Sequence, residues 1–179
     1  MKKVIAVVLI AAVAAFAGCA QKAPEPAPAP VEKAAPDYAA IKALLEQQQN
    51  EYAQAWTNLD MNKIAEIWAH DEDITIWGPA LKARVQGWEG PNGVKAWYEG
   101  AMAGMSKCDF KMHDLMIKVS TDGTAAVITY YVENDFIDKD GKPGKMTPRV
   151  TVVKELRDGV WKQIHGDASY SIEEVKAMK

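Results

Sequence analysis

The sequence lacks the residue clusters on which several functional classes depend. Its 179 residues include two cysteines and three histidines, and His70, His113 and His165 do not have the short spacings of a metal site. Neither a glycine-rich phosphate loop nor a Gly-x-Ser-x-Gly nucleophile elbow is present. Lysine and arginine do not cluster, and the formal net charge is −3, which argues against a nucleic-acid partner. We therefore expect no metal, no cofactor and no nucleic acid.

The longest apolar run lies near the start of the sequence. It covers residues 4–16, follows the basic Lys2-Lys3 pair and leads into Ala17-Gly18-Cys19. The run is too short to span a bilayer, which takes about 20 residues, but its layout is typical of a secretory signal peptide. Residues 16–19 resemble the lipobox of bacterial lipoproteins, whose cysteine is diacylated and becomes the mature N-terminus. The alternative is an ordinary cleaved signal with an incidental cysteine.

This interpretation divides the chain into three parts. Residues 1–18 are the predicted lipoprotein signal peptide, and residues 19–36 hold the lipidated Cys19 and a tether rich in Ala and Pro. Such a composition favours extended polyproline II and forms no core. Residues 37–179 are the predicted folded domain. The anchor predicts a location in the cell envelope on the periplasmic side. The outer membrane is favoured because Ala20, and not aspartate, follows the lipid cysteine.

The first part of the folded region shows helical periodicity. Apolar positions recur at spacings of three and four between residues 37 and 59, which predicts a long amphipathic helix beginning near Asp37. Asp60 is predicted to cap a second helix, a short strand is expected at residues 74–76, and Gly90-Pro91 is expected to open a third helix. The predicted buried stripe of the long helix consists of Ile41, Leu44, Leu45, Gln48, Tyr52, Ala55, Trp56 and Leu59.

From Ser106 onward the period changes to that of β-strands. Alternation along residues 110–119 slips at His113-Asp114, which predicts a β-bulge. Helices followed by long antiparallel strands predict an α+β fold, in which a curved sheet wraps around the long N-terminal helix and leaves a cone-shaped cavity. A capping box at residues 171–174 predicts a short final helix. The later strands are expected at residues 124–136, 147–157 and 160–169, with turn signals at Asp122-Gly123, residues 138–142 and Asp158-Gly159.

The end of the sequence resembles a known superfamily. A strand bearing Thr151 leads to Arg157-Asp158-Gly159-x-Trp161, and His165-x-Asp167-x-Ser169 follows. This order is similar to that of SnoaL-like, nuclear transport factor 2-like domains, in the branch that includes the calmodulin-dependent kinase association domain. There the last motif is His-x-His-x-Ser, so Asp167 stands in place of the second histidine. The resemblance extends over residues 37–169 and implies a cone-like α+β barrel, commonly a homodimer through its sheet.

The resemblance leaves function open, because members include isomerases, dehydratases, cyclases, assembly domains and non-enzymatic ligand binders. Alternation places His165 and Asp167 on one face of the last strand together with Trp161 and Gln163, although the sequence does not fix which face is inward. In one interpretation, His165, Asp167 and Tyr130 bind a ligand or move a proton. In the other, His165 and Asp167 form a satisfied structural pair near the rim of the sheet. The polar candidates for ligand contact are Tyr130, Arg149, His165 and Asp167.

Six tryptophans are many for a domain of this size, and most are expected in the core. The resemblance implies that Trp56, Trp77 and Trp97 wall the cavity, where they would stack on a flat or hydrophobic ligand. Trp88 lies in a glycine-rich loop and is expected to cover the mouth. The sequence thus predicts a membrane-anchored domain that binds a small, partly apolar ligand. Two alternatives are a proton-transfer enzyme of the isomerase or dehydratase kind and a homo-oligomeric assembly or adaptor module.

Overall fold

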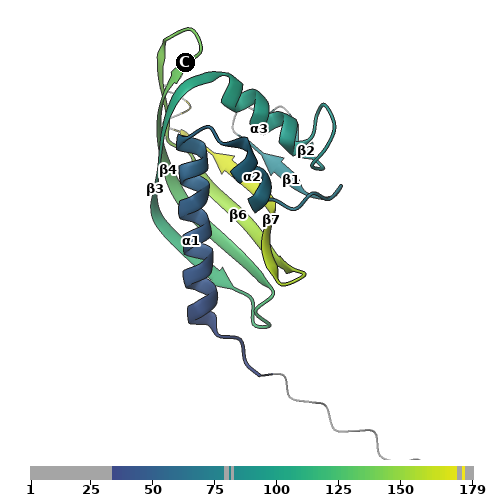
Figure 1. Ribbon diagram of the computed structural model, residues 1–179. Coiled ribbons are helices and arrows are strands. Elements are labelled where there is room, and N and C mark those ends of the chain that lie inside the picture. Colours follow the sequence, from purple (N-terminus) through teal and green to yellow (C-terminus); the bar gives the residue numbers. More distant parts are fainter. Residues whose placement is uncertain (1–33, 79–80, 82, 173–174, 176–179) are drawn as a thin grey trace, which may run out of the picture. The chain divides into compact units, whose positions relative to one another are not determined.

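The computed structural model describes residues 34–78, 81, 83–172 and 175 (Figure 1). The chain divides into two compact units, Met1–Lys33 and Ala34–Lys179, and every described residue belongs to the second. No helix among these residues is both long enough and apolar enough to cross a membrane. The elements are α1 (Tyr38–Thr57), α2 (Met61–Ile67), β1 (Thr75–Trp77), β2 (Val85–Gln86), α3 (Val94–Ala103), β3 (Met105–Val119), β4 (Ala125–Asp138), β5 (Pro143–Met146), β6 (Arg149–Arg157) and β7 (Val160–Ser169).

Carboxylate side chains cap the first two helices, and the predicted cap at Asp60 is confirmed. The side chain of Asp37 accepts a hydrogen bond from the backbone nitrogen of Ala40 at 3.0 Å, directly before α1. Asp60 accepts hydrogen bonds from the backbone nitrogens of Asn62 and Lys63 at 3.0 and 3.2 Å, directly before α2. Each cap satisfies donors that the first turn of a helix leaves free, which stabilises the helix by about 1 kcal/mol. The caps therefore fix where the two N-terminal helices begin.

The start of α3 differs from the expectation. The helix begins at Val94 with Gly93 as its cap, a few residues after Gly90-Pro91. A Cβ atom on residue 93 would collide with the backbone oxygens of Trp88 and Glu89. Glycine is therefore required where the loop turns into α3, and the proline that suggested an earlier start belongs to the loop.

The strands form one sheet in the order β2-β1-β7-β6-β4-β3, and β5 pairs with β4. Neighbouring strands are antiparallel except β1 and β7, which are parallel. Figure 1 shows the sheet bent around α1, which crosses its concave face. The predicted α+β class and curved antiparallel sheet are confirmed, whereas the short strands β2 and β5 do not stand out in the sequence.

The Asp-Gly pair in the C-terminal motif makes the hairpin between β6 and β7. Asp158 and Gly159 have φ values of 51° and 80°, as the central residues of a type I′ turn require. The guanidinium of Arg157 binds Glu155 at 3.0 Å, and Trp161 is buried. Asp158 and Gly159 therefore form the turn, and Trp161 fills a core position. Their structural roles are sufficient to explain why they occur in the motif.

Three register shifts interrupt the sheet, and one of them lies between Met105 and Lys107 at the very start of β3. The other two lie farther into the sheet. The first of these lies between His113 and Met116 of β3, where Asp114 has a φ of 53°, and it confirms the predicted bulge. The second is opposite Val153 and Lys154 of β6 and inserts Ile164 into β7 as an extra residue. An extra residue reverses which side chains face inward beyond it. The second bulge therefore decides which residues of β7 reach the interior.

The core has two parts on the inner face of the sheet. The aromatic half lies among α1, α2, α3 and β1, and the closed half lies where the beginning of α1 covers β4 and β6. Buried residues of the aromatic half include Tyr52, Trp56, Trp68, Trp88 and Tyr98. Buried residues of the closed half include Leu45, Ala126, Ile128, Val152 and Trp161.

Three predictions fall on other parts of the chain. The signal peptide at residues 1–18 and most of the tether at residues 19–36 lie outside the described residues. The final helix expected from residue 171 also falls largely on positions outside them.

Candidate ligand-binding site

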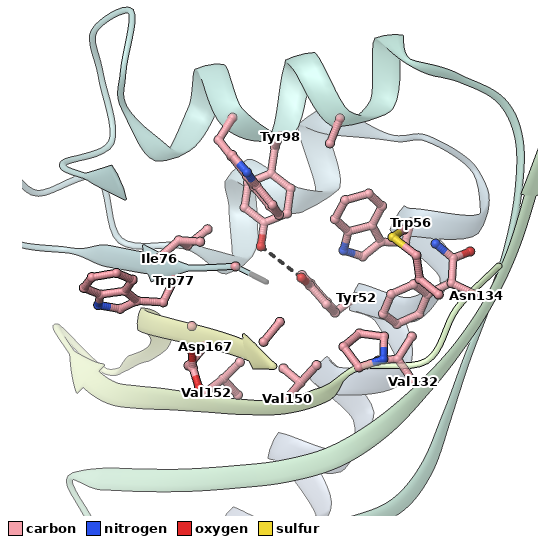
Figure 2. A pocket seen from close by; sticks show the side chains of 18 of the residues that line it. Tyr52, Trp56, Ile76, Trp77, Tyr98, Val132, Asn134, Val150, Val152 and Asp167 are labelled. Carbon is pink, nitrogen blue, oxygen red and sulfur yellow. Dashed lines mark hydrogen bonds between the residues drawn. The ribbon is translucent and has the colours of Figure 1, made fainter. Parts of the chain in front are cut away.

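A cavity of about 290 Å³ lies in the aromatic half, between α1, α3, β1 and the inner face of the sheet (Figure 2). Its size is close to the lower end of small-molecule sites, about 300–1,000 Å³. For comparison, an engineered apolar cavity of about 150 Å³ holds benzene. Val150 and Val152 of β6 form part of its floor, and Trp77 stands at one end. The cavity has room for a molecule of about two fused rings.

Aromatic rings in mutual contact make the walls. Trp56 of α1 stacks on Phe110 of β3 with centroids 5.8 Å apart and an interplanar angle of 7°. It also meets Trp97 of α3 edge to face at 6.4 Å. Such contacts add stability beyond the area that they bury. The predicted places of Trp56 and Trp97 in the cavity wall agree with this geometry.

Three buried aromatic residues form a hydrogen-bonded chain at the cavity. The indole nitrogen of Trp68 donates to the hydroxyl of Tyr98 at 3.1 Å, and the hydroxyls of Tyr98 and Tyr52 are 2.9 Å apart. Burial raises the pKa of Tyr52 and raises that of Tyr98 further. Both hydroxyls therefore stay protonated at neutral pH and present neutral polar atoms.

Three lining residues carry a buried polar atom with no hydrogen-bond partner among the described residues: Trp56 at Nε1, Tyr130 at its hydroxyl and Gln163 at Oε1. Buried polar atoms in folded proteins are almost always paired with protein, water or ligand. An orphaned one costs about 1–3 kcal/mol. These three atoms therefore mark where a molecule in the cavity would be recognised.

The structure separates His165 from the cavity. Because Ile164 is an extra residue in β7, Gly166 and Ala168 take the inward phase that alternation assigned to His165 and Asp167. His165 leaves the sheet on the other face, where its Nδ1 lies 2.7 Å from the Thr75 hydroxyl. The prediction that His165 and Asp167 share a face with Trp161 and Gln163 is wrong for this reason.

Asp167 reaches only the edge of the cavity, and Arg149 lies away from it. Asp167 borders the cavity but pairs in register with Thr151 and Trp77, on the outer face of the sheet. Arg149 is exposed on that outer face, and its guanidinium donates to the backbone oxygen of Tyr170 at 3.3 Å. By contrast Tyr130, the remaining polar candidate, points inward from β4 and lines the cavity.

The two other tryptophans singled out by the sequence have different places. Trp77 lines the cavity at its edge and is 45% exposed. Trp88 is buried and stacks on the ring of His70 at 4.4 Å, away from the cavity lining. The expectation that Trp88 covers the mouth is therefore wrong, because the turn at Gly87 and Gly90 directs the loop back into the core.

A buried lysine of the closed half is absent from the sequence-based predictions. Lys154 is fully buried, and its Nζ donates to Oε1 of Gln48 at 2.8 Å. Desolvation lowers the pKa of Lys154 to about 7. Its position two residues after Val152 on the same face of β6 was the available signal.

The described lining contains one carboxylate, that of Asp167, and no lysine, arginine or histidine. Within the described part of the chain, no three His, Cys, Asp or Glu side chains gather in a way that would hold a metal ion. The thiol of Cys108 is buried and contacts the Oδ1 of Asn134 at 3.1 Å, and burial raises its pKa. The cavity is thus apolar with a few neutral polar atoms.

The sequence model of the SnoaL-like domain matches residues 45–173. The chain belongs to the SnoaL-like family. No curated protein matches it. Among solved structures, a nuclear transport factor 2-like protein from Salmonella enterica has a TM-score of 0.65 at 19% identity, over 73% of this chain and 91% of that one.

Two further structures similar to this SnoaL-like domain differ in the roles that their names give them. A putative dehydratase from Streptomyces avermitilis has a TM-score of 0.63 at 16% identity, over 75% of this chain and 98% of that one. The association domain of CaMKII from C. elegans has a TM-score of 0.56 at 18% identity, over 74% and 96%. At these identities the likeness establishes the fold and leaves function to the site.

Proposed function

We propose that the SnoaL-like domain binds one small, flat, largely apolar molecule in its cavity and releases it unchanged. The observation that carries this proposal is the unfilled space of about 290 Å³ among contacting aromatic rings. Protein interiors are normally packed without such gaps. An apolar hollow of this size, bordered by a few polar atoms, is the usual form of a small-molecule site.

The alternative of a proton-transfer enzyme has less support in this geometry. It needs an acid or base that reaches the bound molecule. His165 is engaged with Thr75 on the outer face, and Asp167 reaches the cavity only at its edge, where it pairs in register with Trp77. Tyr130 does reach the cavity, but burial raises its pKa well above the ordinary value and keeps its proton in place.

Calorimetric titration of the full chain with 2-ethylnaphthalene tests the binding proposal. We expect saturable binding of one molecule per chain. Ala101→Leu adds a larger side chain at the cavity wall and should weaken binding about tenfold. Ala103→Leu is the matched control, because Ala103 lies exposed on the same helix. Absence of saturable binding, or equal loss in both variants, would contradict the proposal.

We also propose that the domain is held at the cell envelope by lipid on Cys19, on the periplasmic side and in the outer membrane. The support is the signal-like layout of residues 1–18 and the lipobox resemblance of residues 16–19. Incorporation of radiolabelled palmitate into the wild-type chain, and its absence in Cys19→Ser, would support the anchor. Recovery of unlabelled wild-type chain in the soluble fraction would contradict it.

A homodimer through the outer face of the sheet is a second proposal, favoured by the exposed apolar side chains there. Val127 and Tyr131 of β4 and Met116 of β3 are 44%, 51% and 65% exposed. Light scattering should give twice the chain mass for wild type and a monomer for Val127→Glu. Val160→Glu, at the exposed β6–β7 turn, is the control and should remain dimeric. A monomeric wild-type chain would contradict the dimer proposal and would not affect the ligand-binding proposal.

A further inference from the structure

We propose that the molecule bound in the cavity carries a neutral acceptor oxygen, such as a ketone carbonyl. The N–H group of Trp56 and the O–H groups of Tyr130 and Tyr52 are the donors from which this oxygen accepts hydrogen bonds. This inference rests on the proposed binding function and adds the chemical class of the ligand. It follows from an excess of hydrogen-bond donors over acceptors around an apolar space.

Trp56 is the simplest of these donors. An indole nitrogen can donate a hydrogen bond and cannot accept one. Among the described residues Nε1 of Trp56 is buried without a hydrogen-bond partner, although it approaches the Tyr52 hydroxyl, and its ring is held by Phe110 and Trp97. Figure 2 shows the nitrogen edge of this ring turned toward the middle of the pocket, on the side of the Tyr52 hydroxyl. A ligand satisfies this donor with an acceptor atom.

The direction of the tyrosine chain supplies a second donor. Trp68 donates to Tyr98, so the buried Tyr98 proton needs an acceptor of its own. The hydroxyl of Tyr52 is the partner within reach, at 2.9 Å. When Tyr98 donates to Tyr52, the proton of Tyr52 has no further partner in the part of the chain that the structure describes. That proton is then available to a molecule in the cavity.

Tyr130 adds a third donor from the sheet. Its side chain is 3% exposed, and its hydroxyl has no partner among the described residues. In register it lies opposite Val150, which forms part of the cavity floor. A raised pKa keeps the proton on this hydroxyl at neutral pH. Tyr130 therefore faces the same apolar space as Trp56 from the opposite wall.

The charge of the lining selects a neutral ligand. A buried carboxylate would need a cation beside it, and the described lining has no lysine, arginine or histidine. Lys154 is committed to Gln48 behind the cavity floor and does not line the cavity. An ammonium group would find acceptors at Asp167, on the edge of the cavity, and at Oε1 of Gln163, but it would leave the three donors without an acceptor. A carbonyl oxygen has two lone pairs and can accept from two of the three donors without either penalty.

Three compounds on one two-ring frame test the inference by calorimetry on the full chain. These are 2-acetylnaphthalene, which carries a ketone, 2-ethylnaphthalene, which has no polar atom, and 2-naphthoate, which is charged. We expect the ketone to bind about five- to tenfold more tightly than the hydrocarbon, and the carboxylate to bind more weakly than either. Equal affinity for ketone and hydrocarbon, or tightest binding of the carboxylate, would overturn the inference while the binding function stood. Binding of none of them would remove both.

Variants locate the effect on the named donors. Trp56→Phe and Tyr130→Phe should each lower the affinity for the ketone toward that for the hydrocarbon and leave the hydrocarbon's own affinity within about twofold. Trp88→Phe and Tyr38→Phe are matched controls away from the cavity and should change neither.

A spectroscopic readout on the wild-type chain needs no variant to fold. The carbonyl stretch of bound ¹³C-labelled 2-acetylnaphthalene should lie below its position in hydrocarbon solvent, because donated hydrogen bonds weaken the C=O bond. A stretch at the hydrocarbon position would mean that no donor reaches the oxygen, and the inference would fail.

Discussion

The two halves of the core share one sheet face but use opposite kinds of side chain. Val150 and Val152 of β6 border the open cavity of the aromatic half, and Lys154, the next inward residue of the strand, is packed under α1 in the closed half. Large aromatic rings in mutual contact cannot rotate to fill the space between them, so a cavity remains. Long flexible side chains such as those of Lys154 and Gln48 can adjust to fill the space and reach each other.

The two halves differ in the property that they determine: the aromatic half determines ligand binding, and the closed half determines stability. In the aromatic half, Nε1 of Trp56 is unpaired among the described residues and borders the cavity, where a ligand would accept its hydrogen bond. Lys154 is buried in the closed half, and Gln49 of α1 is fully buried with both amide atoms unpaired among the described residues. Polar groups buried in this way cost stability without gaining a ligand. Changes in the closed half should therefore alter folding more than binding.

The largest expected effect concerns Lys154 and pH. Its pKa is about 7 in the folded chain and 10.5 for an ordinary lysine. Between these values the unfolded state binds a proton that the folded state does not, so stability rises as the pH rises from about 7 to about 10. The full difference is on the order of 4 to 5 kcal/mol. Urea unfolding measures the unfolding free energies of wild type and Lys154→Met. The wild type should gain stability relative to the variant as the pH rises from about 7 to about 10.

The matched control is Lys118→Met, at an exposed lysine on β3. Its unfolding free energy should follow that of wild type at every pH. A wild-type chain whose stability relative to Lys154→Met does not change between pH 6 and pH 10 would show that Lys154 stays charged in the folded state.

The next effect compares two adjacent leucines of α1. Leu45 is 0% exposed in the closed half, whereas Leu44 is 45% exposed. Leu45→Ala should destabilise the chain by about 3 kcal/mol through lost burial and a residual cavity. Leu44→Ala should stay within about 0.5 kcal/mol of wild type. Thermal and urea unfolding measure both, and equal losses would mean that α1 is rotated relative to the packing described here.

The same helix shows how far periodicity carries a prediction. The stripe at spacings of three and four identifies Leu45, Tyr52 and Trp56 as buried, and they are. It wrongly includes Leu44 and omits Gln49, because an apolar stripe is assigned by residue type and glutamine is taken to prefer water. Which side of α1 faces inward depends on how the helix crosses the sheet. The sequence of the helix alone does not determine that crossing.

Turns and bulges follow the same division between local and distant causes. The Asp158-Gly159 turn and the slip at His113 are visible in the sequence because local backbone preferences produce them. The bulge at Ile164 is not visible, since Gln163 to Asp167 continues an alternating pattern. Its consequence is that Tyr130, Trp56 and Trp97 could be placed at the cavity from the sequence, whereas His165 could not. Arg149 was misplaced for another reason, because alternation along β6 does not say which of its faces is inward.

The smallest effect compares two hydroxyls that border the cavity. The Tyr98 hydroxyl accepts from Trp68 and contacts Tyr52, whereas the Tyr130 hydroxyl has no partner among the described residues. Tyr98→Phe should cost about 1–2 kcal/mol, because it strands the Trp68 donor. Tyr130→Phe should not lower the unfolding free energy of the ligand-free chain and should raise it by up to about 1 kcal/mol, since it removes an unpaired buried hydroxyl. A large loss for Tyr130→Phe without ligand would show that water or protein already satisfies this hydroxyl, and that the cavity's donors are not held in reserve for a bound oxygen.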